Sequence, residues 1–369
     1  MKKTILLLIS VPPPMHGSNF MNQCVLNSSM LHCKFHVLTI QMQYSYCNKN
    51  LKVFSLRKLK LMFIYLFQLI KIVILNKPNA VYFVPAVAGY AFYRDCFFAF
   101  VIKFFKVKII YHLHGKGIIK ETKNYFKFII YKWFFNNSEV IHLSPIMYSD
   151  IENVVSTNQM HYVPNGVSSC DAALNNRCRN NSHVTILYLS NLIPSKGPLL
   201  LLESLRIVMK RGYKFNAIFA GNETKEITAS MFINLIGSYN LNSYVSYVGP
   251  KYDNEKNNLF FKSDIFVFPS QYEREVWPLV ILEAMSFGLP VITTSEGAIS
   301  EFVINSETGF IVDNCTSEEI ADKICYLCDF PEIRYKMGDN AIKHFNNFYT
   351  IDIFENNLVN TIDLILNIN

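Results

Sequence analysis

The chain alternates short apolar runs with longer segments whose apolar residues recur every three or four positions. Short runs predict buried strands of a parallel sheet, and the longer segments predict the helices that cover both of its faces. In the first half, the predicted strands span residues 4–11, 34–40, 80–84, 107–112, 140–143 and 161–163. Predicted helices, notably 59–75 and 95–105, lie between these strands.

A second alternating series follows a polar, aperiodic segment at 167–182, which we interpret as a linker. Its predicted strands span 185–189, 216–220, 245–248, 265–269, 291–294 and 310–312. Its predicted helices run through 199–210, near 225–239, around Glu283 and over 350–368. The pattern predicts an α/β protein with two doubly wound, Rossmann-like domains, 1–166 and 183–346, facing across a cleft. We expect residues 347–369 to form a C-terminal helix that packs back toward the N-terminal domain.

Composition fits two ordinary domains with large cores. The 369 residues are 51% hydrophobic and 17% charged, which excludes a disordered chain. The net charge of +7 has no accompanying basic stripe or reading motif, so nucleic acid is not an expected partner. Nine cysteines at irregular spacing argue against a disulfide framework and for a reducing compartment. We therefore expect a cytoplasmic protein, and the oligomeric state stays open.

The start of the chain is similar to a signal sequence, with two lysines before an apolar run. That run is short and is followed by Pro12, Pro13 and Pro14 without a small-residue cleavage site. A buried first strand explains it better, and we predict no membrane-spanning segment.

Glu275 and Glu283 are the most informative pair of residues. Pro278 lies where a first helical residue is expected, because its missing N–H costs nothing there. Glu275 is then on the loop before a helix, and Glu283 is about a turn and a half inside it. Free N–H groups and the helix dipole favour a phosphate at such a start, and carboxylates accept hydrogen bonds from sugar hydroxyls. The pair therefore predicts a site for a sugar joined to a phosphate.

Two turns near strand ends could contribute to this site. Lys196 follows the first strand of the second domain, near a helix start, where its charge could hold a phosphate. An ordinary surface lysine is the alternative, which the nearby acidic pair makes the minority interpretation. Gly17 follows the first strand of the chain and would let the backbone approach a diphosphate. A rigid turn without a ligand is an equally good interpretation of that segment.

His112 and His114 end a predicted strand of the first domain. We expect their rings to lie on opposite faces, with His114 toward the cleft and His112 a satisfied core histidine. Rings on opposite faces could not share a metal ion. The chain also has no Asp-x-Asp, so no Mg²⁺ or Mn²⁺ site and no cofactor is predicted. Charge on a leaving phosphate would then fall to Lys196 and backbone N–H groups.

Aromatic residues make up 14% of the chain, and three stretches of the first domain mix them with lysines: 61–75, 93–111 and 125–135. Helices of this kind can lie in a membrane interface and reach a lipid-linked substrate. Helices that only cover the sheet are the alternative. The clustering of three stretches in one domain favours peripheral contact with the inner face of the cytoplasmic membrane.

These motifs resemble the family 4 retaining glycosyltransferases of the GT-B fold over nearly the whole chain. The strongest match is the Glu-x7-Glu pattern of Glu275 and Glu283 with the Gly288–Pro290 turn after it. Supporting matches are at Pro164, Asn165, Gly166, Ser195, Lys196, Gly197, Ala220, Gly221, Gly249, Phe268, Pro269, Ser270, Gly309 and Phe310.

The resemblance implies a role for each candidate residue. Glu283 would bind ribose hydroxyls, Glu275 the donor sugar, Lys196 the diphosphate, His114 the reacting sugar, and Gly17 would lie near the diphosphate. His114, Glu275 and Lys196 would be the catalytic residues.

Two departures from the family pattern affect the diphosphate. Many members have an Arg where this chain has Asn191, so Lys196 would carry more of the charge. Many have Gly-Phe-Gly after the first Glu, where this chain has Val276, Trp277 and Pro278. Because Pro278 lacks an N–H, phosphate contact would shift to Leu279 and Val280.

The expected function is retaining transfer of a sugar from a nucleotide diphosphate sugar to a glycan or lipid-linked acceptor, in bacterial surface polysaccharide biosynthesis. One alternative is a nucleotide-sugar epimerase on the same fold, which would turn over donor without acceptor. Another is a non-catalytic nucleotide- or glycan-binding subunit, which would bind donor without turnover. The donor base, the sugar, the acceptor and the linkage are not fixed by these motifs.

Overall fold

The computed structural model describes residues 2–13, 16–44, 55–169 and 183–367. Contacts divide the chain into two compact units, and we describe each by itself. The first unit comprises Met1–Asn165 with Ile351–Asn369, and the second comprises Gly166–Thr350. Residues 170–182, most of the predicted linker, lie outside the described part of the chain.

The first unit is built on a parallel sheet of six strands in the order β2-β1-β3-β4-β5-β6. These strands are β1 (Thr4–Ile9), β2 (His36–Gln41), β3 (Ala80–Phe83), β4 (Lys108–Leu113), β5 (Glu139–His142) and β6 (Met160–Tyr162). All six predicted strands of this half are present, with bounds shifted by at most a few residues. Their side chains are largely buried, which is why they appear in the sequence as continuous apolar runs.

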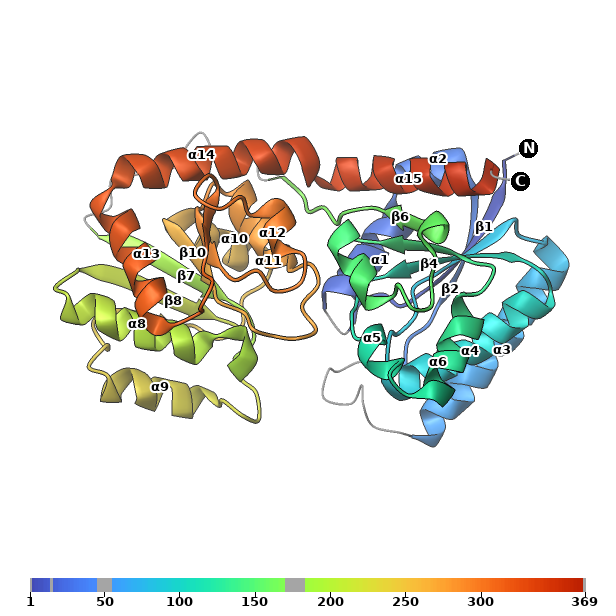
Figure 1. The fold of residues 1–369 in the computed structure, drawn as a ribbon, viewed down its shortest axis with the longest axis horizontal. Coiled ribbons are helices and arrows are strands. Elements are labelled where there is room, and N and C mark those ends of the chain that lie inside the picture. The colour runs from blue at the N-terminus through green and yellow to red at the C-terminus, as the bar shows by residue number, and fades with distance from the viewer. Residues whose placement is uncertain (1, 14–15, 45–54, 170–182, 368–369) are drawn as a thin grey trace. The chain divides into compact units, whose positions relative to one another are not determined.

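Helices cover this sheet (Figure 1). They are α1 (Gly17–Asn27), α2 (Ser29–Lys34), α3 (Leu56–Asn76), α4 (Gly89–Phe104), α5 (Ile118–Glu121), α6 (Tyr125–Phe135) and α15 (Ile351–Asn367). Buried side chains of α3, α4 and α6, such as Leu69, Phe98 and Phe134, share one core cluster with strand residues Val81 and Tyr111. These three helices therefore pack on the same face of the sheet.

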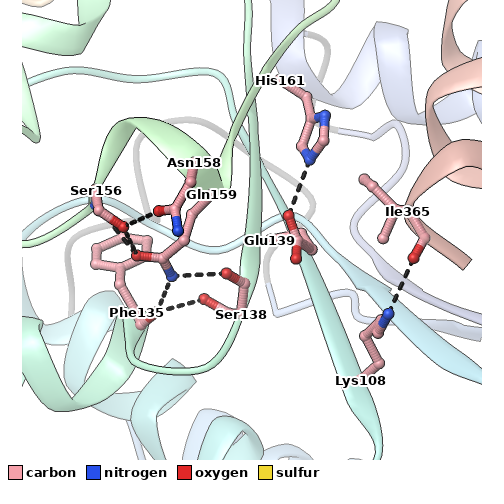
Figure 2. A network of polar contacts seen from close by, with 9 residues as sticks. All are labelled: Lys108, Phe135, Ser138, Glu139, Ser156, Asn158, Gln159, His161 and Ile365. Carbon is pink, nitrogen blue, oxygen red and sulfur yellow. Dashed lines mark hydrogen bonds and ion pairs between the residues drawn. The ribbon is translucent and has the colours of Figure 1, made fainter. Parts of the chain in front are cut away.

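The last helix, α15, belongs to the first unit although it ends the chain. Lys3 Nζ donates to Leu366 O at 2.8 Å. Lys108 Nζ donates to Ile365 O at 2.9 Å, as Figure 2 shows. Both lysines thus satisfy carbonyl groups that the last helical turn leaves open. The helix also contacts α2, and Ser28, the N-cap residue of α2, donates from Oγ to Glu355.

Polar contacts also fix the outer edge of the same sheet (Figure 2). His161 on β6 pairs with Glu139 on β5 at 2.9 Å. Gln159, just before β6, donates to Phe135 O at 3.0 Å and Ser138 O at 2.7 Å. These bonds tie β6 to the end of α6 and the start of β5.

The second unit has a parallel sheet of six strands in the order β12-β11-β10-β7-β8-β9. Its strands are β7 (Val184–Leu189), β8 (Phe215–Ala220), β9 (Val245–Tyr247), β10 (Ile265–Phe268), β11 (Val291–Thr293) and β12 (Gly309–Ile311). Its helices are α8 (Pro198–Lys210), α9 (Ala229–Ser238), α10 (Asp253–Lys262), α11 (Leu279–Ser286), α12 (Ile299–Phe302), α13 (Ser317–Asp329) and α14 (Pro331–Phe348). The predicted strands of this half are all present too.

One helix of the described residues, α3, is long and apolar enough to cross a membrane by those two criteria alone. A single helix of this kind is weak evidence, because helices of water-soluble proteins can pass the same test.

Candidate functional site

The candidate residues of the second unit gather where neighbouring strands end. Strands β10, β7, β8 and β9 are adjacent and parallel, so their carboxyl ends open on one edge of the sheet. Asn191 and Lys196 follow β7, Glu275 follows β10, and Glu283 lies on α11. Parallel pairing therefore places residues from distant parts of this unit along one edge.

Lys196 and Glu275 are in direct contact. Lys196 Nζ lies 3.3 Å from Glu275 Oε2, and Glu275 is only 9% exposed. A carboxylate this buried needs a cationic or hydrogen-bonding partner, which Lys196 supplies. The structure thus brings two of the three predicted catalytic residues together. The Lys196 ammonium group could contact the phosphate of a bound sugar phosphate, and the Glu275 carboxylate could contact its sugar.

The backbone around Glu275 is held by its own turn and by a glycine. The Glu275 N–H donates to Tyr272 O at 2.7 Å, and the Ala298 N–H donates to Val276 O at 2.9 Å. Gly297 has φ +67°, and a Cβ there would lie 2.6 Å from Glu275 O. Only glycine fits so close to this segment in that conformation.

Helix α11 begins at Leu279, and Pro278 is its N-cap residue, so the prediction that Pro278 is the first helical residue is off by one. Proline has no side chain that can cap a helix, and no side-chain cap bond forms here. The Leu279 and Val280 N–H groups at the helix start are therefore uncapped by any side chain, which is the feature that makes a helix start attract anions.

Glu283 has a partner that the sequence did not indicate. Lys256 Nζ, on α10, lies 2.7 Å from Glu283 Oε1, and both side chains are partly exposed. Lys256 stands in a polar helix with no motif around it, so only the strand order, which places α10 beside α11, could have revealed the pair.

Asn191 connects the loops after β7 and β8. Its Oδ1 accepts from the backbone N–H and the side-chain amide of Asn222, both at 3.2 Å. The loops approach closely because Gly221 has φ +152°, and a Cβ there would lie 1.9 Å from Ser190 O. Asn191 is thus a neutral side chain that links the two loops, at a position where the resembled family often has a cation.

In the first unit, Gly17 is the exposed first residue of α1. The preceding residue, His16, caps this helix, because its Nδ1 accepts from the Asn19 N–H. Gly17 therefore lies at the start of an eleven-residue helix after β1, beside His16, which was not among the predicted site residues.

The prediction that His112 and His114 face opposite ways is wrong. Their ring centroids lie 4.2 Å apart. Residues two apart in a strand share a face, so this outcome follows from the pleat itself. His112 is fully buried and its Nδ1 is hydrogen-bonded to the Tyr82 hydroxyl.

A third histidine, His142, ends the adjacent strand β5 and interacts electrostatically with His112 and His114. It is fully buried, and its Nδ1 accepts from the Leu143 N–H at 2.8 Å. Burial lowers the pKa of His142 to about 3, with a further contribution from His114. Burial likewise lowers the pKa of His114 to about 3, with a contribution from His16, and holds the pKa of His112 well below its usual value.

All three imidazoles are therefore neutral near pH 7. Within the described residues, His112 Nε2, His142 Nε2 and both ring nitrogens of His114 have no hydrogen-bond partner. His114 is thus a neutral group with free donor and acceptor capacity, which suits hydrogen bonding to a hydroxyl. In the described ranges, no three His, Cys, Asp or Glu side chains are grouped as metal ligands.

Comparison with known proteins shows that the second unit is similar to glycosyltransferases. Residues 176–344 match the family model Glycosyl transferases group 1, which covers most of the second unit. The chain is 30% identical over 175 residues to the capsular polysaccharide biosynthesis glycosyltransferase CapM of Staphylococcus aureus. That match covers 47% of this chain and 44% of CapM, so it spans less than half of the relative.

Solved structures match the chain over nearly its full length. Sucrose-phosphate synthase from Thermosynechococcus elongatus has a TM-score of 0.75 at 18% identity, and the match covers 98% of this chain and 99% of the synthase chain. HepE of Anabaena in complex with UDP has a TM-score of 0.74 at 17% identity, and the match covers 99% of this chain and 100% of the HepE chain. The predicted fold class is confirmed: two doubly wound units with the GT-B glycosyltransferase architecture.

Proposed function

We propose that the protein is a retaining glycosyltransferase that moves a sugar from a nucleotide diphosphate sugar to a glycan or lipid-linked acceptor. The observation that carries this proposal is the Lys196–Glu275 pair, placed at the sheet edge of a unit that matches the glycosyltransferase model. The uncapped start of α11 supports it, because the same edge then offers N–H donors for a phosphate.

In this proposal, each part of the nucleotide sugar has a protein partner of matching chemistry. Lys196 and the N–H groups of Leu279 and Val280 hold the diphosphate, where a developing negative charge needs fixed positive partners. Glu275 accepts from hydroxyls of the sugar. Glu283 accepts from the ribose hydroxyls, and Lys256, already paired with Glu283, contributes a second charge at that position.

The first unit contributes groups to the same reaction. His114 is neutral, so it donates or accepts a hydrogen bond at a sugar hydroxyl without adding charge. Gly17, at the start of α1, lets the backbone approach the diphosphate.

Retention is proposed to occur by same-face attack, because none of the candidate carboxylates is placed as an obvious covalent nucleophile. The acceptor oxygen forms a bond to the anomeric carbon while the bond from that carbon to the phosphate oxygen breaks. The acceptor's proton passes to the departing phosphate oxygen, and a nucleoside diphosphate leaves.

The acceptor is proposed to be lipid-linked and to serve surface polysaccharide synthesis at the inner face of the cytoplasmic membrane. The name of CapM, a capsular polysaccharide biosynthesis glycosyltransferase, supports this class of product. HepE, crystallised with UDP, supports a UDP-sugar as the donor to try first.

A panel of UDP-, GDP- and CMP-sugars tests the proposal. One member should raise the thermal unfolding temperature, since a ligand that binds only the folded state stabilises it. Transfer to a lipid-linked glycan acceptor should then give a product whose anomeric configuration, measured by NMR, matches the donor. An inverted product contradicts retention, donor conversion without acceptor indicates an epimerase, and donor binding without any turnover indicates a binding subunit.

A further inference from the structure

The outer faces of α3, α4 and α6 expose a stripe of aromatic side chains on each helix. Phe67 on α3 is 70% exposed, Phe104 on α4 is 72% exposed and Phe126 on α6 is 76% exposed. We call these stripes together the aromatic face; its main members are Phe63, Phe67, Phe97, Phe100, Phe104, Tyr125, Phe126 and Trp133. Soluble proteins rarely leave so much contiguous apolar surface without a partner.

The three stripes form one surface. The inner sides of all three helices share one core cluster over the same face of the sheet, so their outer sides point the same way (Figure 1). Helices α4 and α6 are in direct contact, since the rings of Phe92 and Tyr131 stack with centroids 3.8 Å apart. Near their ends, Lys103 Nζ lies 5.7 Å from the ring centre of Trp133.

A shallow groove of about 800 Å³ runs along α3 within this surface. Phe63 and Phe67 line it together with Lys60 and Lys71. The groove is therefore apolar with amines at intervals, a combination that suits acyl chains beside acidic head groups better than a polar ligand.

Charge on the three helices has a single sign at the surface. Their only carboxylate is Asp95, which is fully buried and paired with Arg94 at 2.7 Å. Their exposed charged residues are Arg57, Lys60, Lys71 and Lys132. Such a face complements a negatively charged surface, and each lysine or arginine near anionic lipid adds to the attraction.

Helix α3 lies along this surface and does not cross a membrane in this fold. Its side chains Met62, Leu69 and Val73 are buried in the core of the first unit. Insertion across a bilayer would remove this covering helix from the sheet, whereas lying in the interface uses only the face that the core leaves exposed.

We propose that the aromatic face docks on an anionic phospholipid bilayer, with its phenylalanines at the boundary of head groups and acyl chains. This proposal extends the proposed function, because it names the surface and the lipid chemistry that would bring the chain to a membrane-bound acceptor. The surface lies in the first unit, whereas Lys196 and Glu275 lie in the second. Membrane docking can fail while donor binding succeeds, and the reverse, so the two failures are distinguishable.

Co-sedimentation with vesicles tests the docking. The full chain should sediment with vesicles of phosphatidylcholine and phosphatidylglycerol in equal amounts, and remain in solution with phosphatidylcholine alone. The double variant Phe67→Ser with Phe100→Ser should lose at least tenfold in vesicle affinity. The matched control, Met231→Ser with Ile233→Ser, changes two exposed apolar residues of α9 and should bind as the wild type does.

A second measurement uses the two tryptophans of the chain. Trp133 belongs to the aromatic face, whereas Trp277 is buried in the second unit at 6% exposure. Brominated anionic lipids should quench the wild-type fluorescence, and Trp133→Phe should abolish that quenching.

Three results would overturn the proposal. The first is no sedimentation with either type of vesicle. The second is unchanged binding by the Phe67→Ser, Phe100→Ser variant, with its folding verified by thermal unfolding. The third is wild-type self-association that this variant abolishes in the absence of vesicle binding, which would make the aromatic face an interface between copies of the chain.

Discussion

Buried imidazoles at the ends of β4 and β5 couple the stability of the first unit to pH. His142 is fully buried, and burial lowers its pKa from 6.5 to about 3. An unfolded chain binds a proton at this side chain more readily than the folded chain does. Its contribution to stability is therefore complete above about pH 6.5 and is lost progressively as the pH falls toward 3.

His142→Asn should weaken this dependence. The Asn side-chain oxygen can still accept from the Leu143 N–H, but it cannot take up a proton. Between about pH 7.5 and about pH 5, the wild type should lose roughly 2 kcal/mol more unfolding free energy than the variant. Denaturant unfolding at the two pH values measures this difference, and equal losses in both proteins would show that His142 is not buried neutral.

Gly297 supports the segment that carries Glu275. Gly297→Ala should reduce donor affinity, because a Cβ 2.6 Å from Glu275 O forces that segment to move. Gly212→Ala is the matched control, since Gly212 has φ +88° but its Cβ would meet nothing within 4 Å. The control should lose about 1 kcal/mol of stability from backbone strain alone and bind donor normally. Equal donor binding by both variants, measured by calorimetry, would remove this role for Gly297.

Residue-level features were predictable where they depend on local sequence. The position of Glu275 before a helix, and of Glu283 inside it, follows from Pro278 and the apolar spacing. The Lys256–Glu283 pair and the His142 neighbour were not predictable, because both depend on which strands are adjacent. The orientation of His112 and His114 was predictable, because side chains two positions apart in a strand lie on the same face of the sheet. The prediction of opposite faces did not follow that rule.

Among the elements, α15 shows how a chain end is fixed to a distant part of the sequence. Lys3 and Lys108 donate to carbonyl groups of its last turn, where cations also interact favourably with the helix dipole. The apolar pattern predicted a helix over 350–368 within a C-terminal segment of 347–369, and the structure has the helix at Ile351–Asn367. The lysines that cap it could not be identified from sequence, since they lie more than two hundred residues away.

Replacing both lysines by methionine should destabilise the first unit. The variant Lys3→Met with Lys108→Met loses two charged donors at the helix end, worth about 1 kcal/mol each. Lys34→Gln is the control, because it breaks the more exposed pair with Asp363 and should cost less. Hydrogen exchange of α15 amides measures the effect, and unchanged protection in the double variant would contradict the capping role.

At the scale of the whole molecule, we propose that the positive charge facing a leaving diphosphate comes from lysines and backbone N–H groups. If Lys196 and the start of α11 supply that charge, donor binding and transfer need no divalent cation. Both should therefore persist in excess EDTA, with rates within about twofold of the untreated protein. Loss of transfer in EDTA, restored by Mg²⁺ or Mn²⁺, would show that a metal ion carries the charge instead.

Donor titration of site variants tests the account most directly. Calorimetric titration with the donor selected from the sugar panel should show that Lys196→Ala and Glu283→Ala each weaken binding at least tenfold, or about 1.4 kcal/mol. Arg211→Ala, which removes an exposed cation paired with Asp322 in the same unit, should bind donor as the wild type does. If the Lys196 and Glu283 variants both bind donor with wild-type affinity, the nucleotide sugar is not held at this edge of the sheet.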